Sequence, residues 1–246
     1  MKDVLVLATA GEQDERRFAY AQKFAEAFGA NLDVVLANEL PPPSAVTALP
    51  ITAAAPPPIV DTVEMEAALK LGAERQEALQ ERFAGRNERT VVLRVNETTS
   101  AMGSLIAGLA RTRDTFVCSL PGRDRDLEVS GTILDRVLIE GGRSVIGLPQ
   151  DFEGGFPIRN VTVAWNGSRE SARATAEAMP LLKSAETVTV LLVDQLRRAG
   201  RETRPGDDIL LHLTRHEVKA KVARVAKDEL KTSDAILAEA KRQGAD

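Results

Sequence analysis

A short polar turn, Asn166-Gly167-Ser168, has residue types suited to holding a small anionic ligand. It follows the apolar run 161–165 and precedes a helical pattern, so we expect it at the carboxyl end of a strand and the start of a helix. In open α/β sheets, ligands bind beyond these strand ends, and helix N-termini favour anions. The same pattern also fits a plain turn in which Ser168 caps the helix and no ligand binds. Both interpretations stay open.

A second candidate site is spread over Ser119, Gly122, Gly131 and Thr132. Gly122 follows a predicted strand, and Gly131-Thr132 is predicted to open the next helix, where backbone N–H groups could hold a phosphate. The spacing matches neither the P-loop nor the dinucleotide-binding fingerprint. An ordinary loop is the alternative interpretation.

Other kinds of chemistry find little support in the sequence. The i, i+4 pair His212 and His216 lacks an H-E-x-x-H pattern and an evident third ligand, so we predict no metal site. No G-x-S-x-G motif or readable Ser/His/Asp set is present, which favours a non-enzymatic protein. The single cysteine, Cys118, lies in an apolar run and is expected to be buried and inert. One cysteine also fits a reducing compartment.

Charge and hydropathy limit the partners of the chain. The formal net charge of −4 and the pI near 5.5 argue against broad nucleic-acid binding, which needs clustered basic residues. No apolar run approaches the ~20 residues of a membrane span, and the N-terminal run is too short for a secretory signal. We therefore expect a cytoplasmic protein with no nucleic-acid or membrane partner.

The elements that must position these residues form a regular alternation through residues 1–150. Apolar runs without polar alternation are typical of strands in a parallel sheet that is covered on both faces. These runs span residues 3–9, 31–37, 90–96, 114–120 and 144–149, with helical patterns between them. The order predicts a doubly wound, Rossmann-like α/β domain. The Pro-rich segment 41–58 should be an extended excursion, which could be a lid, a partner-binding strip or an unimportant loop.

The pattern resets at the Gly- and Pro-containing segment 151–157, which we interpret as a linker. A second domain over residues 157–246 then shows three strand patterns, at 161–165, 187–194 and 218–225. Aligning Val6 with Val163 superimposes the element order of the two halves and pairs Thr9 with Asn166, which suggests an internal repeat.

The opening of the second half, residues 161–174, resembles that of a bacterial universal stress protein (UspA-type) domain. Residues 131–138 and 144–146 resemble the closing helix and strand of such a domain. The resemblance implies two domains of the Rossmann-like HUP type with strand order 3-2-1-4-5, the second incomplete. It also implies a non-enzymatic stress-response role through dimerisation or partner binding, as a homodimer or as a pseudo-dimer between the halves.

Some universal stress proteins bind ATP, using an Asp after the first strand and a G-x-x-G-x9-G-[ST] loop after the fourth. Here the Asp position carries Thr9 in the first half and Asn166 in the second. The loop is reduced to Ser119, Gly122, Gly131 and Thr132 in the first half, and the second half ends before a fourth strand. The resemblance therefore implies at most weak ATP binding. Its candidate ligand residues are Asn166, Gly167, Ser168, Thr9, Gly122, Gly131 and Thr132.

Without fourth and fifth strands, the run 161–165 would expose an unpaired sheet edge, which invites pairing with another chain. Three arrangements remain open: a shortened product of partial stability, completion of the sheet by a partner, or cover by the first half. Two other functions also stay open. One is an adenine-nucleotide-dependent enzyme of the wider α/β group, and the other is a structural pairing module without a ligand.

Overall fold

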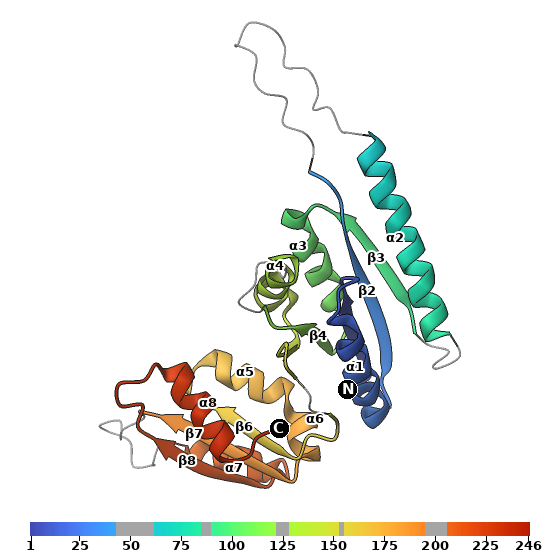
Figure 1. The fold of residues 1–246 in the computed structure, drawn as a ribbon. Coiled ribbons are helices and arrows are strands. Elements are labelled where there is room, and N and C mark those ends of the chain that lie inside the picture. Colours follow the sequence, from blue (N-terminus) through green and yellow to red (C-terminus); the bar gives the residue numbers. More distant parts are fainter. Residues whose placement is uncertain (43–61, 85–89, 122–127, 153–154, 195–205) are drawn as a thin grey trace, which may run out of the picture. The chain divides into compact units, whose positions relative to one another are not determined.

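The computed structural model describes residues 1–42, 62–84, 90–121, 128–152, 155–194 and 206–246. The chain divides into two compact units, Met1–Glu153 and Gly154–Asp246, each built around its own parallel sheet (Figure 1). Most of the Pro-rich segment 41–58 lies outside the described residues, so its predicted conformation is not addressed.

The first unit contains a five-stranded parallel sheet in the order β3-β2-β1-β4-β5, which confirms the predicted 3-2-1-4-5 topology. All four ladders are parallel. The central strands are almost fully buried, as expected for near-continuous apolar runs. The strands are β1 (Asp3–Ala8), β2 (Asn31–Glu39), β3 (Val92–Glu97), β4 (Thr115–Ser119) and β5 (Ser144–Leu148).

Helices cover both faces of this sheet. α1 (Asp14–Phe28) and α2 (Thr62–Phe83) pack together through the edge-on ring contact of Phe18 with Phe83, at 5.4 Å between centroids. α3 (Thr99–Ala110) and α4 (Glu128–Arg136) close the core on the other face, against side chains such as Leu5 and Phe116. A π-helical turn, Val137–Gly141, continues α4. The result is the predicted three-layer α/β arrangement.

The start of α4 differs from our prediction. We expected Gly131 and Thr132 to open this helix, but it begins at Glu128, so both residues lie inside it. A glycine is not required at a helix start, and acidic residue types are favoured in the first turn. The first helical turn therefore presents Val129 and Ser130 to the strand ends instead.

The second unit contains a three-stranded parallel sheet in the order β6-β7-β8, as predicted. Its core lies between β7 and helices α6 and α7, and includes Leu182, Val190 and Leu213. Within the described ranges, β6 pairs only with β7 and so forms one edge of the sheet. The elements are β6 (Asn160–Ala164), α5 (Arg169–Glu177), α6 (Met179–Ser184), β7 (Thr187–Val193), α7 (Asp207–Arg215), β8 (Ala220–Val225) and α8 (Thr232–Arg242).

The two units share one hydrogen-bonding detail at the start of their first strands. The carboxylate of Asp114 accepts from the backbone N–H of Asp3 at 3.1 Å, and that of Asp246 accepts from Asn160 N–H at 2.8 Å. Asp3 and Asn160 are equivalent in the alignment that pairs the two halves. In both units this carboxylate anchors the amino end of a strand that the sheet alone would leave frayed.

No helix in the described ranges is long and apolar enough to cross a bilayer.

Candidate functional site

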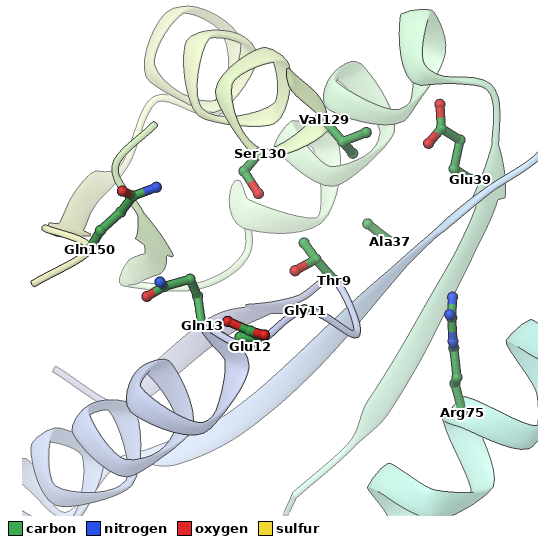
Figure 2. A pocket seen from close by; sticks show the side chains of 10 residues that line it. All are labelled: Thr9, Gly11, Glu12, Gln13, Ala37, Glu39, Arg75, Val129, Ser130 and Gln150. Atoms are coloured by element: carbon green, nitrogen blue, oxygen red, sulfur yellow. The ribbon is translucent and has the colours of Figure 1, made fainter. Parts of the chain in front are cut away.

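A cavity of about 720 Å³ opens at the carboxyl end of the first sheet (Figure 2). In this topology the strand order reverses at β1, because β2 and β4 lie on either side of it. The loops that leave β1 and β4 therefore diverge and leave a crevice, which is where ligands bind in open α/β sheets. The lining residues are Thr9, Gly11, Glu12, Gln13, Ala37, Glu39, Arg75, Val129, Ser130 and Gln150.

The first turn of α4 forms one wall of this cavity. Ser130 is only 3% exposed, and Figure 2 shows its hydroxyl directed toward the loop that carries Thr9. The early N–H groups of a helix have no partners within the helix, so this wall has a positive electrostatic character. Gln150, which follows β5, lies at the other end of the same wall.

The loop after β1 is closed by a carboxylate of the chain itself. Asp14, the first residue of α1, is buried and folds back onto this loop. Its oxygens accept hydrogen bonds from the backbone N–H groups of Thr9 at 3.1 Å and Ala10 at 2.9 Å, and from the Thr9 hydroxyl at 3.1 Å. The N–H groups of Thr9 and Ala10 are therefore already occupied by this carboxylate.

Arg17 connects this loop to the end of β4. Its side chain is 1% exposed and forms an ion pair with Asp14. Its Nη2 also donates to Thr9 Oγ1 at 2.8 Å, and its Nη1 donates to Ser119 Oγ at 3.3 Å. A buried guanidinium is tolerated when a carboxylate and hydrogen bonds compensate its charge. The network thus fixes the carboxyl ends of β1 and β4 relative to each other beneath the cavity.

The described wall of the cavity carries more negative than positive charge. Glu12 and Glu39 are acidic, and Arg75 of α2 is the single basic residue among the lining residues that the structure describes. Glu39 also accepts a hydrogen bond from the hydroxyl of Thr99 at the start of α3. Figure 2 shows Arg75 extending from α2 toward the space beside Glu39. The cavity is consequently polar and weakly anionic.

The described lining set offers hydroxyls but no histidine or lysine that could activate them as nucleophiles. The described lining residues include no histidine, cysteine or lysine. Cys118 on β4 is fully buried, and this burial raises the pKa of its thiol to about 12, so its thiolate is nearly absent at neutral pH. No cluster of three or more metal-ligating side chains occurs in the described part of the chain. The arrangement suits binding of a polar molecule through hydroxyl, amide and backbone groups.

The structure brings only some of the predicted residues of the first half to this cavity. Thr9 lines it, whereas Gly131 and Thr132 follow Ser130 in α4 and do not. Gly122 lies outside the described residues.

Several residues at this site were not predicted from the sequence. Glu39 and Gln150 lie just where predicted strands end, so strand-end position could have identified them. Asp14 and Arg17 form an i, i+3 pair at a helix start, a pattern that suggests a cap but not a buried network. Arg75 lies within a long, largely exposed helix, and nothing in the sequence distinguished it.

The turn after β6 adopts the capped form that we considered as an alternative to ligand binding. Ser168 Oγ accepts the backbone N–H of Ser171 at 3.2 Å and caps α5. Asn166 Oδ1 accepts the backbone N–H of Ser168 at 2.9 Å. Gly167 has a φ of +73°, which a residue with a side chain rarely adopts. The side-chain oxygens of this turn are therefore used internally.

A smaller cavity of about 370 Å³ lies beside this turn in the second unit. Asn166 and Ser168 line it, while Gly167 does not, and apolar walls come from Trp165, Leu191 and Ile236. Its acidic member, Glu170, is solvent-exposed. A hydrogen bond from the Arg169 side chain, with further donors at the start of α5, lowers the pKa of Glu170 to about 2. The carboxylate therefore stays ionised beside a recess with both polar and apolar walls.

No family model matches the chain, and no curated protein does either. Among solved structures, a universal stress protein from Archaeoglobus fulgidus DSM 4304 superimposes with a TM-score of 0.71. The match covers 99% of this chain and 82% of that protein, at 13% sequence identity. The chain has a universal stress protein fold.

Two further universal stress proteins match parts of this fold. The UspA protein from Lactobacillus plantarum aligns with 60% of this chain and 97% of its own, at 17% identity and a TM-score of 0.45. A universal stress protein in complex with cAMP aligns with 60% of this chain and 95% of its own, at 16% identity and a TM-score of 0.34. At these identities the comparisons with universal stress proteins concern the fold.

Proposed function

We propose that the chain is a non-enzymatic, cytoplasmic stress-response protein that binds an adenine nucleoside or nucleotide in the cavity of its first unit. The ligand would act as a regulator of dimerisation or partner binding. The observation that carries this proposal is the cavity of about 720 Å³ at the strand-order reversal of a universal stress protein fold. This volume is within the range of small-molecule sites, roughly 300 to 1,000 Å³.

The chemistry of the lining residues supports a purine nucleoside as the core of the ligand. Thr9 and Ser130 bring hydroxyls, and Gln13 and Gln150 bring amides that can both donate and accept hydrogen bonds. These groups match the mixed donors and acceptors of a base and a ribose. ATP therefore remains a candidate ligand, together with its dephosphorylated forms, and we propose no metal requirement.

A role without catalysis is supported by the side chains at the cavity. Catalysed phosphoryl or adenylyl transfer needs groups that position and neutralise the phosphates, together with a nucleophile or base. Arg75 is the one basic residue of the described lining set. We therefore expect no sustained hydrolysis of ATP. Steady turnover that is lost on substitution of the lining residue Ser130 would instead favour the enzyme alternative.

Isothermal titration of the full chain with adenosine and with ATP tests the binding proposal. An added Cβ at Gly11 would meet only Thr9 Oγ1 at 3.4 Å, so a Gly11→Leu side chain can extend into the cavity without displacing the backbone. We expect this variant to lose binding at least tenfold. Gly108→Leu is the matched control, because nothing lies within 4 Å of its added Cβ and it is remote from the lining set. Absence of binding heat with either ligand at millimolar concentration would overturn the proposal.

We also propose self-association, as a homodimer, because each sheet ends in edge strands that carry unpaired backbone groups. In the described ranges these are β3 and β5 of the first sheet and β6 and β8 of the second. Sedimentation velocity between 1 and 100 μM, with and without adenosine, should show a dimer whose population responds to the ligand. A single monomeric species over this range would refute the dimerisation part.

A further inference from the structure

We infer that the first-unit cavity selects an uncharged, nucleoside-sized ligand over the phosphorylated forms of that ligand. The inference deepens the proposed function and rests on it, because it concerns the same cavity. It depends on two features of this chain: a carboxylate that already fills the anion position of the β1–α1 loop, and the charges of the described cavity wall.

The first feature is the internal carboxylate of Asp14. Backbone N–H groups at the end of a strand and the start of a helix are the usual donors to a bound phosphate. At the end of β1, the N–H groups of Thr9 and Ala10 donate to Asp14 at 3.1 and 2.9 Å. A phosphate would have to displace a buried carboxylate that is also paired with Arg17. The N–H groups of Thr9 and Ala10 are therefore not free to bind a phosphate.

The same network removes Arg17 as a cationic partner for a ligand. Its guanidinium lies at the ends of β1 and β4, the place at which a positive charge would favour phosphates. However, its side chain is 1% exposed and its charge is neutralised by Asp14. The Asp14–Arg17 pair therefore contributes almost no net charge to the cavity.

The second feature is the balance of charges on the described wall. Glu12 and Glu39 outnumber Arg75, which leaves one net negative charge among the ionised lining residues. The first turns of α1 and α4 oppose this with the partial positive charge of helix N-termini, each equivalent to about half an elementary charge. At α1, the carboxylates of Asp14 and Glu15 in the first turn offset that charge. The balance of the described wall is therefore negative, which disfavours each added phosphate and leaves a neutral nucleoside unaffected.

The test is isothermal titration of the full chain with adenosine, AMP and ATP, without Mg²⁺, at about 20 and 300 mM salt. We expect adenosine to bind most tightly and ATP least tightly. Because exposed charges are screened within about 10 Å at 0.1 M salt, the ratio of the ATP and adenosine dissociation constants should shrink as salt is added.

Glu12→Gln removes one wall charge with little change of shape, and it should reduce that ratio by roughly two- to fourfold at low salt. Glu26→Gln is the matched control, because Glu26 is an exposed glutamate of α1 that does not line the cavity. It should leave the ratio unchanged.

The possible outcomes separate this inference from the proposed function. If ATP binds as tightly as adenosine or more tightly, the inference is overturned while the binding proposal stands. An equal response of the ratio to Glu12→Gln and Glu26→Gln would also overturn it. If none of the three compounds binds, the proposed function fails and the inference falls with it. A preference for adenosine that salt and Glu12→Gln both reduce supports the inference.

Discussion

Replacement of Asp14 by alanine should destabilise the first unit strongly, because it leaves Arg17 as an uncompensated buried charge. The Asp14 and Arg17 side chains are 11% and 1% exposed, so water can screen or solvate neither group effectively. Breaking a buried ion pair by removing one partner typically costs about 3 to 5 kcal/mol. That is a large part of the roughly 5 to 15 kcal/mol by which most domains are stable.

The opposite single substitution, Arg17→Met, should cost less than Asp14→Ala. Asp14 would keep its hydrogen bonds from the Thr9 hydroxyl and from the N–H groups of Thr9 and Ala10. In addition, Arg17 Nε is buried without a hydrogen-bond partner among the described residues, so the native arginine is not fully compensated. The double variant that combines Asp14→Ala with Arg17→Met should be more stable than Asp14→Ala alone, because it no longer buries a positive charge.

The assay is urea unfolding followed by two signals. Far-UV circular dichroism reports on both units, whereas the single tryptophan, Trp165, lies in the second unit. Asp14→Ala should move the first-unit transition to lower urea and leave the Trp165 fluorescence transition in place. Acetate should partly restore the stability of Asp14→Ala by occupying the vacated carboxylate position. It should do nothing for the double variant, which lacks the cation.

Two results would refute this reasoning. One is a loss of less than about 1 kcal/mol for Asp14→Ala, since that is the range of an exposed ion pair. The other is equal acetate rescue of Asp14→Ala and of the double variant, because the rescue would then not depend on Arg17.

Three further outcomes follow from individual contacts. In Gly72→Ala the new Cβ would lie 2.5 Å from Asn38 Cγ, so thermal unfolding should show that the free energy of unfolding falls by about 1 to 3 kcal/mol. Gly108→Ala is the control: nothing lies within 4 Å of its added Cβ, so the free energy of unfolding should rise by about 0.5 to 1 kcal/mol. Cys118, with its pKa raised to about 12 by burial, should react with a disulfide reagent at pH 8 about 1,000-fold more slowly than a free thiol, and denaturation should abolish the difference. Burial opposes ionisation of Asp114, but backbone N–H donors at the start of β1 outweigh it and lower its pKa below 3.8. Its stabilising effect is therefore present above pH 3.8 and is lost as the pH falls through the lowered pKa. In a plot of unfolding free energy against pH, Asp114→Asn should make the decline at acid pH shallower. An unchanged decline would contradict this assignment.

The sheet was largely predictable because buried parallel strands read as apolar runs. The strand predicted at 31–37 is observed as β2 at Asn31–Glu39, and the strand predicted at 187–194 is observed as β7 at Thr187–Val193. Helix boundaries were less predictable, as the helix after β6 shows. The single helix expected from Ser168 is divided into α5 and α6, with Pro180 in the first turn of α6. Proline has no N–H to donate and is tolerated at a helix start, so the division costs little.

The candidate site was less predictable, because its walls come from segments far apart in the sequence. Thr9 was identified because it occupies the position at which the resemblance to universal stress proteins places an Asp. Ser130 was missed because glycine was taken as the start of α4, whereas the helix begins three residues before Gly131. Arg75 reaches the cavity only through the packing of α2 on the sheet, where Gly72 allows close approach to Asn38. Packing of this kind leaves no local signature in the sequence.

The carboxylate at the end of β1 shows why matching by position alone misleads here. The resemblance to universal stress proteins places an Asp directly after the first strand, and Thr9 occupies that position. The structure nevertheless has a carboxylate at this strand end, because Asp14 folds back from α1 and bonds the N–H groups of Thr9 and Ala10. This acidic residue lies five positions after Thr9 in the chain. It faces the loop and Arg17 and is not a lining residue of the cavity. A carboxylate that faced the cavity could accept a hydrogen bond from a ribose hydroxyl. The Asp14 carboxylate instead faces the loop and occupies N–H groups that could otherwise bind an anion. The ligand preference that we propose for this cavity therefore rests on the position of the Asp14 carboxylate on the loop side.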